Sequence, residues 1–191
     1  MNFSNKKGYD LTARLATMGM LFALAMALSF IESTLPALPM LPQGVKLGLS
    51  NIVTMYCLFS MSGRDAFTLA VLKSGFVLLL RGPIGGLISL CGGLASVAVM
   101  LLLLLLPRLK LSTLTISIAG AVFHNVGQLT AAHLVVGSGF VFYYFPVMLI
   151  SGIVMGVLTG MVLRLTYPYL ERLKKQAVGP KNAAQGPVKK G

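Results

Sequence analysis

The chain has 191 residues, of which 56% are hydrophobic and only 10% are charged, whereas a soluble domain carries roughly 25% charged residues. Apolar runs long enough to cross a bilayer recur along most of the length, which predicts an all-α polytopic membrane protein. The alternating strands of an outer-membrane barrel are absent. The net charge of +12 comes from bases near the ends and in short connections. Topology and anionic lipid explain that charge better than a nucleic-acid partner does.

In chain order, the sequence predicts three parts. Residues 1–13 form a polar N-terminal segment, residues 14–165 form a six-transmembrane-helix bundle, and residues 166–191 form a basic, disordered tail. We expect the first apolar run to be a permanent span rather than a removable signal peptide, because another span follows at once and no small-residue cleavage site precedes it. The predicted spans cover residues 14–31, 45–61, 66–80, 84–106, 114–136 and 140–165.

The distribution of bases sets the orientation of these six spans. With six spans both termini lie on one side, and the other side receives only Lys46 and Arg81. Loops rich in Lys and Arg stay in the cytoplasm, so we expect a multi-pass plasma-membrane protein with both termini cytoplasmic. The bases assigned to that side, besides those of the tail, are Lys6, Lys7, Arg14, Arg64, Arg108, Lys110 and Arg164.

A turn-rich stretch, residues 39–51, separates the first two spans. Its prolines cannot continue a helix, and Gly44 and Gly48 permit tight turns or close backbone approach. Lys46 and Asn51 then stand at the mouth of the next apolar run. A polar lid that feeds side chains into a membrane segment suits a small-molecule pocket. The alternative is a plain connecting loop with a snorkelling lysine.

Ionisable groups inside a membrane are costly and mark functional candidates. Glu32 closes the first span, Lys46 opens the second, Lys73 lies in the middle of the third, and Arg81 ends it. Three cations against one carboxylate favour an anionic ligand, which Arg81 would bind through two hydrogen bonds and Lys73 as a point charge. The alternative is internal pairing, with Glu32 neutralising one cation.

The fifth span carries a second polar group, made of His124, Asn125 and Gln128. His124 and Gln128 are one helical turn apart and share a face. Because hydrocarbon cannot satisfy such groups, they must face the bundle interior or a cavity. They are candidates for a pocket wall, and the alternative is hydrogen bonding between helices. Tyr143 is a further candidate for ligand stacking, although an aromatic belt at the membrane surface also explains it.

Small residues recur every four positions on two spans. Gly19, Ala23 and Ala27 do so on the first span, and the last span repeats the pattern with glycines at 152, 156 and 160. Such stripes let helix backbones touch, either inside the bundle or against a partner protein. Cys57 and Cys91 lie in apolar runs and are expected to be packing residues rather than metal ligands or a disulfide.

Several enzymatic motifs are missing from the sequence. It contains no Gly-x-x-x-x-Gly-Lys-[Ser/Thr] loop for ATP and no aspartate-rich motif for a magnesium-bound diphosphate. It shows no combination of nucleophile, base and acid. We therefore expect no catalytic residues, no metal and no cofactor in this chain, and no enzymatic activity of the chain alone.

These features together resemble a known family. The stretch Pro42-Gln-Gly-Val-Lys-Leu-Gly-Leu-Ser-Asn-Ile52, the glycine-rich fourth span and the stretch Gly120-Ala-Val-Phe-His-Asn-Val-Gly-Gln128 are similar to the Gx transporter family, also called heptaprenyl diphosphate synthase component I. The resemblance covers residues 12–167. It extends to the substrate-binding S components of bacterial energy-coupling factor (ECF) transporters.

The resemblance implies a membrane subunit that binds a vitamin or an isoprenoid precursor and docks on a shared ECF transmembrane subunit through small residues of the first helix. Here those residues match Ala23 and Ala27. Two separate ATPases would supply the energy. The family's other name implies an accessory role in making the isoprenoid tail of menaquinone, so that role is the alternative function. A structural membrane adaptor is a third.

Overall fold

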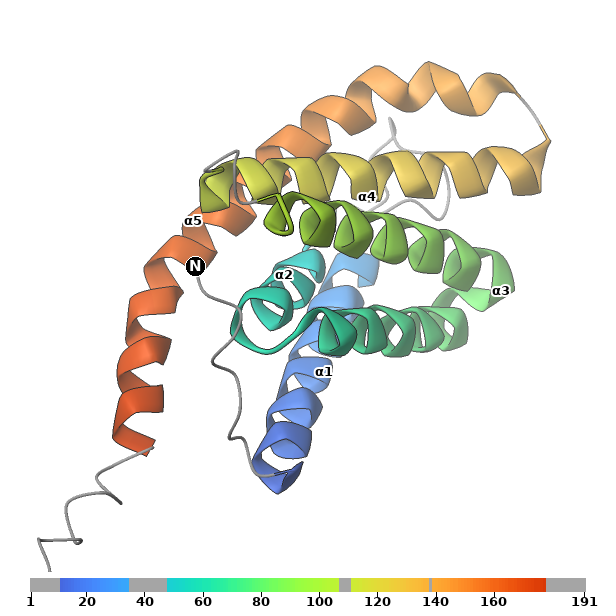
Figure 1. Cartoon of the computed structure of the whole chain (residues 1–191). Coiled ribbons are helices and arrows are strands. Elements are labelled where there is room, and N and C mark those ends of the chain that lie inside the picture. Colours follow the sequence, from blue (N-terminus) through green and yellow to red (C-terminus); the bar gives the residue numbers. More distant parts are fainter. Residues whose placement is uncertain (1–10, 35–47, 107–110, 138, 178–191) are drawn as a thin grey trace, which may run out of the picture.

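The computed structural model describes residues 11–34, 48–106, 111–137 and 139–177, and all the regular structure in these ranges is helical (Figure 1). The α-helices are α1 (Leu11–Thr34), α2 (Asn51–Ser60), α3 (Gly63–Leu104), α4 (Thr113–Val136) and α5 (Phe145–Ala177). A 3-10 helix, η3 (Gly139–Tyr144), joins α4 to α5. The described residues thus hold five α-helices where the sequence predicted six spans.

The difference in number arises at Gly82, inside α3. Its φ of 76° and ψ of −178° are not helical, and Pro83 follows, so the helical path reverses at this point. Figure 1 shows the two arms of α3, residues 63–81 and 83–104, running antiparallel. These arms correspond to the predicted third and fourth spans, and Gly85 and Gly86 let them approach closely below the turn. A Cβ on Gly86 would lie 2.6 Å from the Cβ of Leu78.

The second predicted span is shorter than expected. Helix α2 has ten residues and rises about 15 Å, half of the roughly 30 Å hydrocarbon core. The residues directly before it, 48–50, are not helical, and φ of Gly48 is +94°. The apolar composition of residues 45–61 therefore overestimated the length of the helix.

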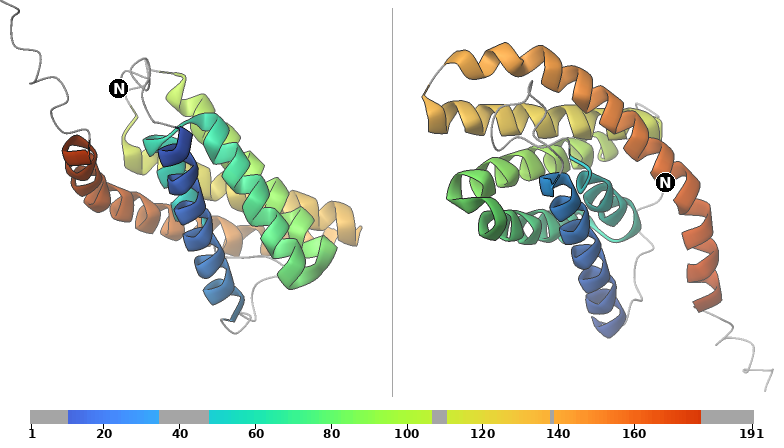
Figure 2. Two further views of the ribbon diagram at one scale, coloured as in Figure 1. Left: turned by 90° about the horizontal axis from the view of Figure 1, so that it is seen from below. Right: turned by 180° about the vertical axis from the view of Figure 1, so that it is seen from behind.

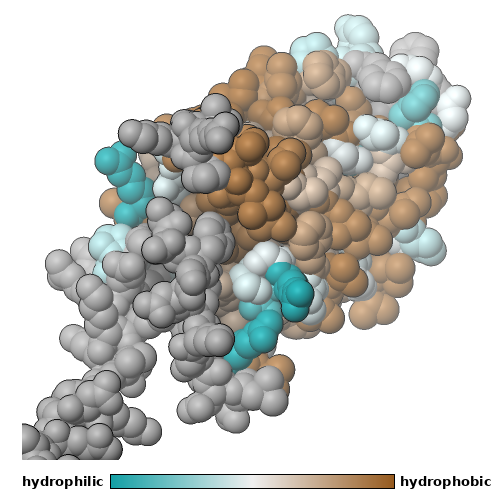
Figure 3. All heavy atoms as spheres, in the orientation of Figure 1, coloured by the Kyte–Doolittle hydropathy of each residue, from teal (hydrophilic) through white to brown (hydrophobic). Residues whose placement is uncertain are grey.

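Three helices among the described residues are long and apolar enough to cross a membrane, over residues Arg14–Thr34, Gly63–Leu104 and Phe145–Thr166. Figure 3 shows the matching surface, on which hydrophobic residues cover most of the described face and hydrophilic residues form a few small groups. Helix α5 continues to Ala177, so residues 166–177 of the predicted tail are helical. The rest of that tail lies outside the described residues.

Helix α4 packs between the second arm of α3 and α5 (Figure 2). Small residues make both contacts close. On the α5 side, a Cβ on Gly156 would lie 2.5 Å from the Cα of Ile118. Ser117 also donates to the Gly156 carbonyl at 2.7 Å. The glycine stripe of α5 is therefore used inside the bundle.

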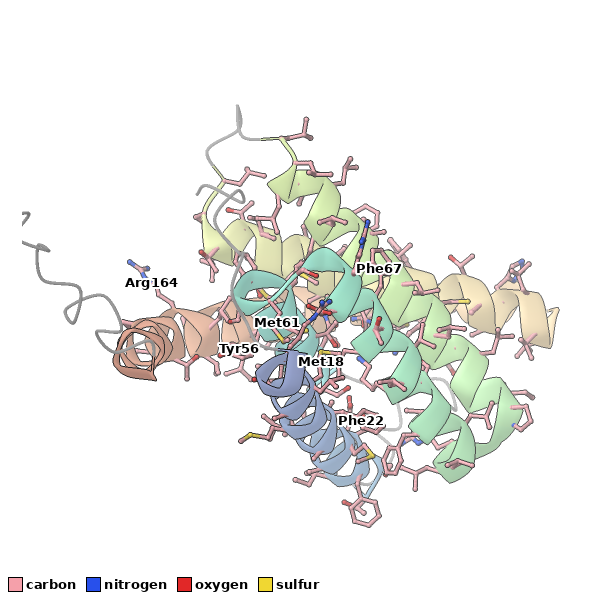
Figure 4. The ribbon with its side chains drawn as sticks, turned by 60° about the horizontal axis from the view of Figure 1, so that its bottom comes forward. Met18, Phe22, Tyr56, Met61, Phe67 and Arg164 are labelled. Carbon is pink, nitrogen blue, oxygen red and sulfur yellow. The ribbon has the colours of Figure 1, made fainter. Side chains whose placement is uncertain are left out.

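Helix α1 packs through one face against α2 and the first arm of α3. Met18 and Phe22 point toward these elements in Figure 4, and the Met18 Sδ lies 3.8 Å from the Cys57 Sγ. Near the starts of α1 and α3, the Arg14 guanidinium donates to Asp65 Oδ1. The opposite face of α1 is exposed and carries Gly19, Ala23 and Ala27. The two stripes with the same spacing thus have different surroundings.

Candidate functional site

Glu32 and Gly48 form the first contact of the site. Glu32 lies on the buried face of α1, with Leu21, Ala25 and Ser29, and is 5% exposed. The backbone N–H of Gly48 donates to Glu32 Oε1 at 2.5 Å. The positive φ of Gly48 favours glycine, and a Cβ there would meet the His124 ring at 3.4 Å. Gly48 therefore lies between the carboxylate of α1 and the imidazole of α4.

Asn51 extends the site to α3. It is the first residue of α2 and is buried. Its Nδ2 donates to Ser96 Oγ in the second arm of α3, at 3.1 Å. A side-chain hydrogen bond thereby joins the start of the short helix to the interior of the bundle.

His124 and Gln128 lie one turn apart on α4, on the face predicted from their spacing. Their Nε2 atoms are 2.9 Å apart, and both side chains are buried. With the Gln128 amide nitrogen as donor, the His124 Nε2 accepts, and the ring proton of neutral imidazole then lies on Nδ1. Gly92 makes room for the pair, since a Cβ there would lie 2.6 Å from Gln128 Cγ and 2.9 Å from the His124 carbonyl oxygen.

We call Glu32, Gly48, Asn51, Ser96, His124 and Gln128 the central polar cluster, because contacts link them and they lie deep in the bundle. His124 is the twelfth of the 24 residues of α4, so the non-helical backbone of residues 48–50 reaches the middle of that helix. Inside a membrane, such backbone is tolerated only where protein buries it or where it lines a cavity.

Lys73 lies at the same depth as this cluster. Its side chain is 1% exposed, in the middle of the first arm of α3. Across the two arms, a Cβ on Gly93 would lie 3.4 Å from Ala70, and one on Gly86 would lie against Leu78. Interpolating between these contacts places Lys73 at about the level of residue 90, close to the level of Gly92 on the second arm.

The other predicted site residues lie elsewhere. Arg81 is partly exposed at the turn of α3, eight residues beyond Lys73. Tyr143 is 81% exposed in η3 and packs edge-on against Tyr144. Its position favours the alternative, an aromatic belt. Lys46 lies outside the described residues.

Asn125 is buried but turns toward α5 rather than toward His124. Its Nδ2 donates to the Met148 carbonyl at 2.7 Å, as expected for a contact between helices. Adjacent residues on a helix differ by about 100° in direction, which explains why the side chains of His124 and Asn125 point toward different neighbours. Asn125 also lines a narrow crevice between α4 and α5 that leaves no room for a water molecule.

Two polar atoms among these residues have no hydrogen-bond partner in the described structure, Glu32 Oε2 and Asn125 Oδ1. Within the described residues, no group of three or more His, Cys, Asp or Glu side chains is placed to hold a metal ion.

Sequence reasoning missed Ser96 and Gly92 as parts of this cluster, and took Gly48 as a position for a tight turn or a close backbone approach rather than as a member of the cluster. A serine on an apolar helix that also carries Ser89 has no distinguishing signal. The sequence did show that the fourth span is rich in glycine, but not which helix packs against its glycines. Only the fold shows that Gly92 faces His124 and Gln128.

Comparison with known proteins agrees with this architecture. A solved structure described as the S component of a bacterial ECF transporter matches with a TM-score of 0.51 and 20% identity, covering 89% of this chain and 99% of that one. No curated protein sequence matches the chain. The family model for heptaprenyl diphosphate synthase component I matches residues 21–166. The chain therefore belongs to the heptaprenyl diphosphate synthase component I family and has the fold of an ECF S component.

Proposed function

We propose that this protein is the membrane-embedded substrate-binding subunit of an uptake system for a small anionic molecule, similar to a vitamin or an isoprenoid precursor. The observation that carries the proposal is the central polar cluster, where irregular backbone and buried polar side chains from four helices meet halfway along α4. Substrate sites of membrane transporters are typically built near mid-depth from interrupted helices.

The anionic part of the proposal rests on Lys73. A buried ammonium at the depth of the cluster is typical of a substrate pathway. Arg81 lies at the turn, so Lys73 is the described cation best placed to attract a carboxylate or phosphate. Asn51, His124 and Gln128 would then fix the neutral part of the molecule through hydrogen bonds.

The exposed face of α1 supports a partner in the membrane. A Cβ on Gly19 would meet nothing within 4 Å, and Ala23 and Ala27 lie on the same exposed face. We propose that this stripe docks on the transmembrane subunit of an energising module whose ATPases are separate chains.

Ala23→Leu with Ala27→Leu should then abolish uptake and capture of that subunit while leaving the melting temperature unchanged. A double variant that still transports normally would rule out docking through this face.

Purification in mild detergent, followed by mass spectrometry of bound small molecules and proteins, tests the proposal. We expect a compound with a carboxylate or phosphate group, together with a membrane subunit and ATPases that carry Walker motifs. A bound compound without any acidic group would contradict the anionic part.

The family description favours one other function, accessory subunit of heptaprenyl or other polyprenyl diphosphate synthesis for menaquinone. In that case a soluble, aspartate-rich prenyl synthase should co-purify in place of the ATPases. We propose no catalysis by this chain in either case, because its sequence has no acidic motif for a metal-bound diphosphate.

A further inference from the structure

The two carboxylates that the structure describes differ in how they are satisfied. Asp65 has partners at both oxygens, since Oδ1 accepts from Arg14 and Oδ2 accepts from Ser62 Oγ at 3.1 Å. Glu32 accepts the Gly48 N–H at Oε1, while Oε2 has no hydrogen-bond partner among the described residues. Both residues are buried, but Glu32 belongs to the central polar cluster, whereas Asp65 lies at the start of α3.

A buried carboxylate oxygen without a donor is unfavourable, and a positively polarised N–H group compensates it best. The Gly48 N–H fixes the carboxylate orientation from one side, and only a residue that tolerates φ of +94° places that N–H there. Gly48 is thus a positioning residue for the Glu32 carboxylate. Its second oxygen, Oε2, can still accept a hydrogen bond.

We propose that Glu32 Oε2 binds an ammonium or N–H group of the substrate, so that the molecule carries a donor nitrogen as well as its anionic group. This inference rests on the proposed substrate-binding function. Charge balance supports it, because Lys73 and Glu32 place one cation and one carboxylate at the bundle interior, complementary to a ligand with one group of each sign.

Thermal unfolding of the purified protein tests the inference with two simple probes, methylammonium and tetramethylammonium chloride, at matched ionic strength. Methylammonium has N–H donors and tetramethylammonium has none. We expect methylammonium to raise the melting temperature with an apparent Kd about tenfold lower, as a charge-assisted hydrogen bond implies. This preference should vanish in Glu32→Gln and persist in the matched control Asp65→Asn, whose carboxylate is already satisfied.

Equal responses to the two probes, or a preference that survives in Glu32→Gln, would overturn the inference. If Glu32→Gln is too unstable to measure, Glu32→Asp replaces it, because it keeps the charge but withdraws the carboxylate by one methylene. A weakened preference in Glu32→Asp supports the inference, and an unchanged one overturns it. The measurement needs no partner protein, so its failure alongside co-purified ATPases would leave the proposed function standing.

Discussion

Gly92 shows how a single missing side chain builds the site. The His124–Gln128 pair rests against this glycine, and any Cβ there would overlap Gln128 Cγ at 2.6 Å and the His124 carbonyl at 2.9 Å. The carbonyl belongs to the α4 backbone and cannot move without moving the helix. The polar pair is therefore held as much by the shape of α3 as by its own hydrogen bond.

We predict that Gly92→Ala lowers the stability by about 1–3 kcal/mol, because it overpacks the contact between α3 and α4. Gly93→Ala is the matched control. Its Cβ would lie 3.4 Å from Ala70, at ordinary contact distance, so its stability should stay close to that of the wild type. Thermal unfolding in detergent measures the stability of both variants. If Gly92→Ala proves as stable as Gly93→Ala, small movements relieve the crowding at Gly92 and the prediction is wrong.

At the residue scale, the sequence predicted the burial of several polar residues and the shared face of two of them. The spacing of His124 and Gln128 was sufficient to place them on one face, and burial of Glu32 and Lys73 follows from their positions in apolar segments. Asn125 could not be separated from His124 without knowing which helix lies on each side of α4. Arg81 was grouped with Lys73 by charge alone, and eight residues of helix keep them apart.

At the scale of elements, two stripes with the same spacing have opposite roles. The α5 stripe lies against α4, where a Cβ on Gly156 would be 2.5 Å from the backbone of Ile118. The α1 stripe at Gly19, Ala23 and Ala27 faces outward. A sequence motif for close helix contact does not say where the second helix is, so the sequence left both assignments open.

The two stripes predict opposite responses to the same substitution. Gly156→Ala should lower the stability by about 1–3 kcal/mol, because the added methyl group meets backbone that cannot turn aside. Gly19→Ala should leave the stability unchanged or slightly raised, since its methyl group meets nothing and alanine favours the helix. Denaturation of both variants in the same detergent gives the comparison. A destabilised Gly19→Ala would mean that α1 is packed differently.

Helices α3 and α2 show where apolar runs in the sequence predict helix boundaries correctly and where they do not. The Gly82-Pro83 turn was recognisable because proline disfavours a continuing helix and glycine accepts a positive φ. In the run at residues 45–61, Gly48 was noted as permitting a tight turn, but the apolar residues around it gave no sign that the helix begins only at Asn51. Hydropathy reports burial, and buried backbone here includes a non-helical segment.

At the scale of the whole molecule, the helix directions bring the two described ends together. Chain reversals lie between α1 and α2, between α2 and α3, at Gly82, and on both sides of α4. The start of α1 and the end of α5 consequently lie toward the same side in Figure 1. Arg14, Arg64 and Arg164 lie on helix parts that face this side, and Figure 4 shows Arg164 extending away from the bundle.

This arrangement, with the excess of Lys and Arg on one side, predicts that the shared side is cytoplasmic. Single cysteines in a background without Cys57 and Cys91 test it by labelling intact cells with a membrane-impermeant maleimide. Labelling should occur at two positions in outward connections and fail at two on the basic side until the cells are permeabilised. The four variants are Gln43→Cys and Ser138→Cys for the outside, and Arg64→Cys and Gln185→Cys for the inside. Labelling of Arg64→Cys in intact cells would show that the orientation is the opposite of the predicted one. A substrate would then have to reach the central polar cluster from the cytoplasm, which would rule out uptake as the function.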